Sequence, residues 1–281
     1  MLKLNSGGTL MNSKRKWLAA GLLILVALAS GGCDFMDKLK ARDHLNRGVE
    51  AYRMKSYNEA EQEFKAAIEL DPELLDAYLY LATTYRVQFV PLVSTPDNLR
   101  MAQQAIATFE KVLEKDPVNQ NAMANIADLY RNMGEPDKAK EWYRRLMEVQ
   151  EDKSQALYGI GVIDYNLASE KTGEDGENVQ NLSEEELAEV TRVVDEGIEV
   201  LRQALQINPR FTNAMEYLNL LYREKAELAR DEEERRRWVR EADKLALQAV
   251  EMKRQLEREA EEARRRLFKA EEERQQQEQK Q

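Results

Sequence analysis

The feature that most constrains this chain is a recurring pair of small residues within helix-forming sequence. Gly48 and Ala60 lie 12 residues apart, and Phe64 follows Ala60 by one helical turn. Small residues let two helices approach closely where they cross, while Phe64 gives the second helix an apolar face. Pro72 ends that helix, because proline disfavours helical geometry in the residue before it. Residues 41–72 therefore predict two antiparallel helices.

The pair of small residues recurs along the chain with a regular offset. The second small residue of one pair always lies 22 residues before the first small residue of the next pair, whereas the separation within a pair is 12, 23 or 36 residues. Each insertion therefore falls between the two helices of its own repeat. The first helices carry Gly48, Ala82, Ala127, Gly161 and Asn219, and the second helices carry Ala60, Ala105, Ala139, Gly197 and Ala242.

Spacing of this kind resembles the tetratricopeptide repeat (TPR), in which two antiparallel helices occupy 34 residues. The resemblance covers residues 41–252. It implies an all-α fold, a right-handed superhelix (α-solenoid) of about five helix-turn-helix repeats with a long C-terminal helix, and binding of a protein or peptide partner. The implied repeats are 41–74, 75–119, 120–153, 154–211 and 212–256, and a charged helical tail occupies 253–281.

The first 32 residues are typical of a secretory signal peptide. Lys14-Arg15-Lys16 precede an apolar run of 13 residues, Trp17 to Ala29. A helix needs about 20 apolar residues to span a bilayer, so this run favours a cleaved segment over a membrane anchor. Met11 is a second candidate for the first residue of the signal peptide.

The small residues Gly31-Gly32 before Cys33 resemble a bacterial lipobox. That resemblance implies that Cys33 becomes the first residue of the mature chain and carries lipid, followed by a linker over 33–40. It places the repeats at the periplasmic side of the bacterial cell envelope, on the inner or the outer membrane. Ala27-Leu28-Ala29 offers an alternative cleavage site, which would release a soluble protein with a free thiol.

The first helix of each repeat is expected to line the inner curve of the array. One position on these helices carries a Tyr or an Arg in every repeat. Tyr offers flat contact area with a polar tip, and Arg binds carboxylates with two parallel hydrogen bonds. These residues are the candidate partner-binding groove, with ordinary surface side chains as the alternative. They are Tyr52, Arg86, Arg131, Tyr165 and Arg223.

The insertions of repeats two and four differ in character. The first contains the apolar residues Phe89, Val90, Leu92 and Val93, which either pack over neighbouring helices or form an exposed patch for a partner or a membrane. The second, over 170–181, is polar and lacks the alternating ligands of an EF-hand, so we expect a solvated loop. Thr95-Pro96 and Ser183 are typical starts of the helices that follow.

The chain from Glu232 onward predicts one long helix. Its apolar positions have an irregular three-to-four spacing, which is a weak coiled-coil pattern. Either residues up to Leu256 complete repeat five and the rest is a solvated helix, or the tail associates with itself or with a helical partner. The apolar positions are Ala242, Leu245, Ala249, Met252, Leu256, Ala263, Leu267 and Ala270.

Composition narrows the function further. One Cys and one His exclude a disulfide framework and a Cys/His zinc cluster within one chain, and we expect no catalytic residue, metal or cofactor. His44 is expected to pack beside the core. The formal net charge is −10, and residues 33–224 hold 36 acidic against 22 basic side chains. Nucleic-acid phosphates require concentrated Lys and Arg, so nucleic-acid binding is excluded.

These features predict a non-catalytic, lipid-anchored scaffold that binds a partner peptide or domain in the groove. Two other functions stay open. One is a structural tether or oligomerising adaptor that acts through the C-terminal helix. The other is a small-ligand-binding protein or hydrolase, for which the sequence offers no Gly-rich phosphate loop and no Ser/His/Asp combination.

Overall fold

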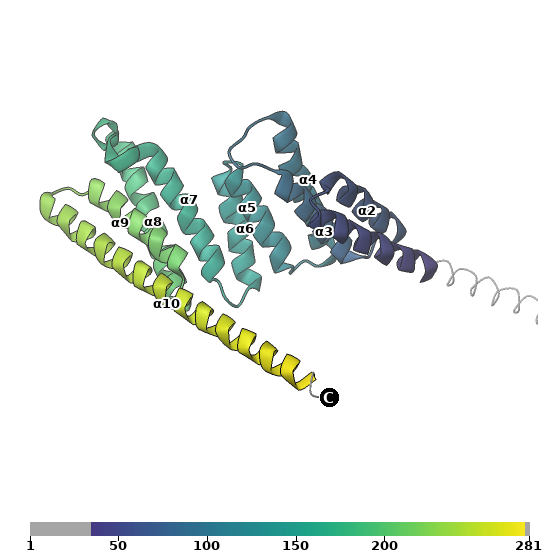
Figure 1. Cartoon of the computed structure of the whole chain (residues 1–281). Coiled ribbons are helices and arrows are strands. Elements are labelled where there is room, and N and C mark those ends of the chain that lie inside the picture. The colour runs from purple at the N-terminus through teal and green to yellow at the C-terminus, as the bar shows by residue number, and fades with distance from the viewer. Residues whose placement is uncertain (1–34, 279–281) are drawn as a thin grey trace, which may run out of the picture. The chain divides into compact units, whose positions relative to one another are not determined.

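The computed structural model describes residues 35–278, and within them every regular element is a helix (Figure 1). The predicted all-α fold is confirmed. Two short 3-10 turns, η1 (Glu174–Gly176) and η2 (Val179–Asn181), lie between α7 and α8. The helices are a first helix over 35–53, α2 (Tyr57–Leu70), α3 (Leu75–Gln88), α4 (Pro96–Lys115), α5 (Gln120–Asn132), α6 (Pro136–Val149), α7 (Ser154–Thr172), α8 (Glu184–Ile207), α9 (Thr212–Glu227) and α10 (Glu232–Glu278).

These helices follow one another in five pairs, and each insertion lies between the two helices of a pair. The loop over 89–95 separates α3 from α4, and the segment over 173–183 separates α7 from α8. Both helices that follow an insertion are capped as predicted. The Thr95 hydroxyl accepts from the backbone N–H of Asn98, with Pro96 as the first helical residue, and Ser183 forms a reciprocal capping box with Glu186. None of the described helices combines the length and the apolar character that crossing a membrane requires.

The chain divides into two compact units, and the boundary falls between Ala122 and Met123 in α5. In the first unit, α3 packs against α2 and α4 around a core that includes Phe64 and Phe109. In the second unit, α7 packs against α8 and α9 against α10, with α8 also against α9. Leu201 and Leu221 are fully buried there.

The small residues mark close helix crossings, as the spacing predicts. A Cβ atom on Gly48 would stand 2.5 Å from the Phe64 ring, and one on Gly161 would stand 2.5 Å from Leu201. Real Cβ atoms do not approach other heavy atoms so closely, so only glycine permits these crossings at their observed spacing. In the fifth pair, the Asn219 side-chain amide instead donates a hydrogen bond to the backbone carbonyl of Ala242 on α10.

The two ends of the described chain are helical. The first helix is present from residue 35, inside the segment 33–40 that the sequence reading assigned to a linker. At the other end, α10 confirms the predicted long helix, which is drawn in yellow in Figure 1. Burial on α10 stops at Leu256, and every residue over 257–275 is exposed. Packing against α9 therefore covers only the first half of α10.

Candidate functional site

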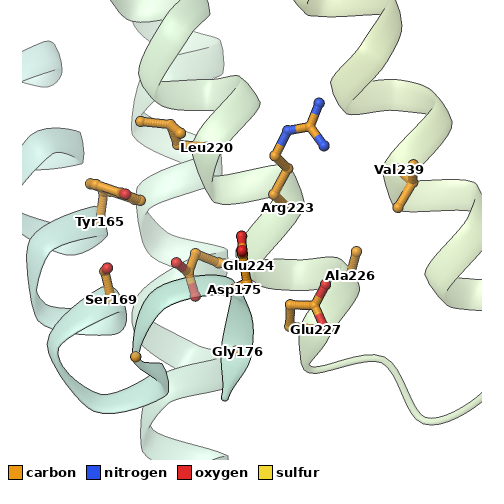
Figure 2. Close-up of a pocket in the computed structure, with 11 residues that line it drawn as sticks. Tyr165, Ser169, Asp175, Gly176, Leu220, Arg223, Glu224, Ala226, Glu227 and Val239 are labelled. Atoms are coloured by element: carbon orange, nitrogen blue, oxygen red, sulfur yellow. The ribbon is translucent and has the colours of Figure 1, made fainter. Parts of the chain in front are cut away.

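The site that best matches the predicted groove is a pocket of about 280 Å³ in the second unit. Its walls come from α7, η1, α9 and α10, and Figure 2 shows its lining side chains. Tyr165 on α7 and Arg223 on α9 both line it. These two residues belong to successive repeats, and the structure brings them to one cavity.

An aromatic row adjoins Tyr165 on the first helices of repeats four and five. The Tyr165 and Tyr217 ring centroids lie 5.6 Å apart with an interplanar angle of 80°, and Tyr158 meets Tyr217 with the same distance and angle. All three rings are half-buried. Edge-to-face contacts of this kind hold the rings in fixed orientations, and all three rings pack against the hydrophobic core of the second unit.

Arg223 is held at the rim of the pocket by α10. Its Nη2 lies 2.9 Å from Oδ1 of Asp243, and both side chains are exposed. Figure 2 shows the guanidinium pointing away from Asp175 and Glu224. An exposed ion pair contributes about 0–1 kcal/mol to stability. Arg223 can therefore exchange Asp243 for another carboxylate at little cost.

The floor of the pocket is acidic. The Thr172 hydroxyl, which is fully buried, donates a 2.7 Å hydrogen bond to Oε2 of Glu224. Burial raises the pKa of the Glu224 carboxyl, and the bond from Thr172 opposes that rise. Glu227 and Asp175 add two further carboxyl groups to the lining. The pocket thus offers a cationic rim and an acidic floor.

The insertion of repeat four forms one wall of this pocket. Gly176, with φ +74°, packs against α9 so closely that a Cβ atom would stand 2.8 Å from Cβ of Glu227. Asp175 and Glu177 are exposed, as expected of a solvated loop. The loop backbone, however, rests on α9. Glycine permits this close approach, because it has no side chain that would hold the loop away from the helix.

The other predicted groove residues lie elsewhere. In the first unit, Tyr52 is half-buried with its ring 5.8 Å from that of Tyr57, and Arg86 is exposed.

In the second unit, Arg131 donates a 2.8 Å hydrogen bond to Oδ1 of Asp128. The Tyr143 hydroxyl donates to the same oxygen at 2.6 Å. Arg131 is thus part of a partly buried network, and its Nε finds no hydrogen-bond partner among the described residues.

The apolar loop of repeat two divides into a buried and an exposed part. Phe89 is 7% exposed and belongs to the core, so its assignment to a partner patch is wrong. Leu92 is 87% exposed with φ +63°, and Val90 and Val93 are exposed beside it. The Asn98 side chain accepts from the Val90 N–H and donates to the Val90 and Val93 carbonyls, at 2.6–2.8 Å. These bonds hold the exposed loop in one conformation.

His44 contacts the second helix of its own repeat. His44 Nδ1 lies 2.7 Å from Oε2 of Glu63 on α2, which makes it a bridge between the helices of repeat one. Among the described residues, no group of three or more His, Cys, Asp or Glu side chains is arranged to hold a metal ion. Cys33 and the signal peptide over 1–32 lie outside the described residues.

Sequence reasoning missed Tyr158 and Tyr217, whose rings form a row with Tyr165 but do not line the pocket. The signal was present for Tyr158, which precedes Tyr165 by seven residues and so lies two helical turns away on the same face. Tyr217 could not be assigned in this way, because its contacts with α7 depend on how repeats four and five pack together.

Comparisons with known proteins agree with the helix pairs. Residues 44–74 and residues 100–159 each match the tetratricopeptide repeat family. The chain contains tetratricopeptide repeats. Over 110 residues it is 29% identical to "Tetratricopeptide repeat protein 8" of Mus musculus, an alignment that covers 39% of this chain and 19% of the mouse protein. The chain therefore matches about a fifth of that relative's length.

Solved TPR structures share the fold. A MamA protein is 17% identical with a TM-score of 0.54, and the alignment covers 77% of this chain and 94% of MamA. MamA from Desulfovibrio magneticus RS-1 is 16% identical with a TM-score of 0.53, over 77% of this chain and 96% of that one. At these identities the likeness establishes the TPR fold.

Proposed function

We propose that this TPR chain is a non-catalytic scaffold that binds a partner peptide or domain along the first helices of its repeats. The observation that carries the proposal is that Tyr165 and Arg223, which come from different repeats, line one pocket. A binding groove requires this convergence of successive repeats, whereas unrelated surface residues have no reason to share a cavity.

Tyr165 and Arg223 favour a peptide with an apolar or aromatic side chain next to a carboxylate that stays at the Arg223 rim, away from the acidic floor. The row of Tyr158, Tyr165 and Tyr217 offers aromatic contact area. Arg223 offers a charged donor. Its ion pair with Asp243 is exposed and therefore weak. An acidic side chain or a C-terminal carboxylate of the partner would replace Asp243.

Mutation of the groove arginines tests the proposal. The partner is first identified by crosslinking from the anchored protein, and its binding is then titrated against Arg223→Ala and Arg86→Ala. We expect each variant to weaken binding by roughly 1–3 kcal/mol through loss of a charge-assisted contact. Arg131→Ala should weaken binding too, but it should also lower stability, since Arg131 pairs with Asp128 in a partly buried network.

Arg100→Ala is the matched control. Arg100 is exposed on α4 and pairs with Asp97 at 3.2 Å, so the substitution removes the same charge from a second helix. It should leave binding unchanged. The groove would be contradicted if all three arginine variants, Arg86→Ala, Arg131→Ala and Arg223→Ala, bound the partner with wild-type affinity. If changes at Val90, Leu92 or Val93 then abolished binding, the loop of repeat two would be the binding surface.

The N-terminal sequence supports the proposed location of the scaffold. A signal peptide followed by Gly31-Gly32-Cys33 favours lipidation of Cys33 and attachment to the bacterial cell envelope, facing the periplasm. Mass spectrometry of the mature N-terminus should find acyl groups on Cys33, and Cys33→Ser should leave uncleaved precursor or released protein. A mature chain that starts at Ser30 with an unmodified thiol would rule out the anchor.

A second candidate function is self-association through the tail. Leu267 and Phe268 are exposed on the second half of α10, where every residue over 257–275 is exposed. Deletion of residues 257–281 should then reduce the oligomeric mass measured by light scattering while groove binding persists. An unchanged mass would exclude this function.

A further inference from the structure

The first helix displays an apolar cluster at its N-terminal end. Phe35 is 68% exposed, Met36 49% and Leu39 55%. At 100° per residue these three positions span an arc of about 100°, so they share one face of the helix. Exposed apolar groups gathered in this way mark a surface that is covered in the working molecule.

The same face becomes polar two turns later. The positions seven residues after Phe35, Met36 and Leu39 are Arg42, Asp43 and Asn46, and all three are exposed. The apolar cluster, which we call the N-terminal apolar face, is thus limited to residues 35–39. At 1.5 Å per residue it is about 6 Å long.

Chain length places this face beside the lipid anchor. Only Asp34 separates Cys33 from Phe35, and an extended residue spans at most about 3.6 Å. Phe35 therefore lies within about 7 Å of the Cα atom of Cys33, too close for a flexible tether. If Cys33 carries lipid, the first turns of the helix are held at the membrane surface.

We propose that the N-terminal apolar face, formed by Phe35, Met36 and Leu39, inserts into the bilayer interface and makes the lipid anchor of this TPR array a rigid one. The inference rests on the proposed lipidation of Cys33. An apolar contact with the bilayer adds to the membrane affinity that the lipid on Cys33 supplies. Residues 34–43 carry three acidic and three basic side chains, so attraction to anionic lipid contributes little and the contact is mainly apolar.

Tryptophan quenching tests the insertion. Full-length protein purified from bacterial membranes is placed in phosphatidylcholine vesicles with or without brominated acyl chains, which quench tryptophan only on contact. Leu39→Trp reports on the N-terminal apolar face, and Asn46→Trp, seven residues further along the same side, is the matched control. Trp142 and Trp238 contribute equally to both variants. We expect quenching several-fold greater for Leu39→Trp, with little change in high salt.

The outcomes separate this inference from the proposed function. Mass spectrometry of the N-terminal peptide reports lipidation of Cys33 by itself. In a second sample, a chain that starts at Cys33 is coupled through its thiol to a maleimide phospholipid. This sample is anchored whether or not Cys33 is lipidated naturally. Quenching of Leu39→Trp in the coupled chain supports the N-terminal apolar face even if natural lipidation is absent. Equal quenching of Leu39→Trp and Asn46→Trp, or none, in the anchored protein would overturn the inference.

Discussion

Repeats one and five differ at the point where their two helices cross, although both also have polar links between the helices. In repeat one, Gly48 lies directly against the buried ring of Phe64, so the helices meet through apolar contact. In repeat five, Asn219 occupies the corresponding position and donates to the Ala242 carbonyl. Ion pairs between Arg223 and Asp243 and between Lys253 and Glu216 add further links from α9 to α10.

The difference shows what a TPR helix crossing requires. In repeat five, α9 and α10 also meet through the Tyr222 and Trp238 rings, 5.4 Å apart. A side chain larger than glycine is tolerated at the crossing when its polar atoms bond to the facing backbone.

Gly48→Leu should have the largest effect on stability. The added side chain would overlap the Phe64 ring, and overpacking of this kind costs on the order of 1–3 kcal/mol. Urea unfolding measures the loss, and hydrogen exchange should locate it in the first helix and α2. Ala107→Leu adds leucine at an exposed helical position and should change little.

Asn219→Leu should cost less, about 0.5–1.5 kcal/mol, because it removes one hydrogen bond without forcing the helices apart. Asn213→Leu is the control, since Asn213 is exposed on the same helix. The loss is measured by urea unfolding and by hydrogen exchange in α9 and α10. Equal losses for Gly48→Leu and Asn219→Leu would show that these residues do not occupy equivalent positions.

Lys253→Ala should have the smallest effect. Lys253 pairs with Glu216 across α9 and α10, but both side chains are exposed, so we expect a loss of about 0–1 kcal/mol. Added salt should abolish the difference between this variant and wild type, since salt screens exposed charges. A large loss that persists in high salt would mean that the polar links, rather than distributed packing, hold repeat five together.

The candidate site was predictable in part. Tyr165 and Arg223 were identified from one recurring position on the first helices, and the structure places both at one pocket. The contribution of η1 was not predictable, because the contact between Gly176 and α9 depends on the path of the loop and not on a periodic pattern. Arg131 shows the same limit, since its bond to Asp128 uses local geometry that the recurring position does not encode.

The sequence by itself determined the helix pairs, the places of the insertions, the caps at Thr95 and Ser183 and the long last helix. These follow from local rules, because spacing, capping and proline act within a few turns of one helix. Only the tertiary structure decided that Phe89 is buried while Leu92 is exposed, that Asn219 bonds across to α10, and that packing on α10 ends at Leu256. Each of these depends on which surface a neighbouring helix presents, and a side chain far away in the sequence sets that surface.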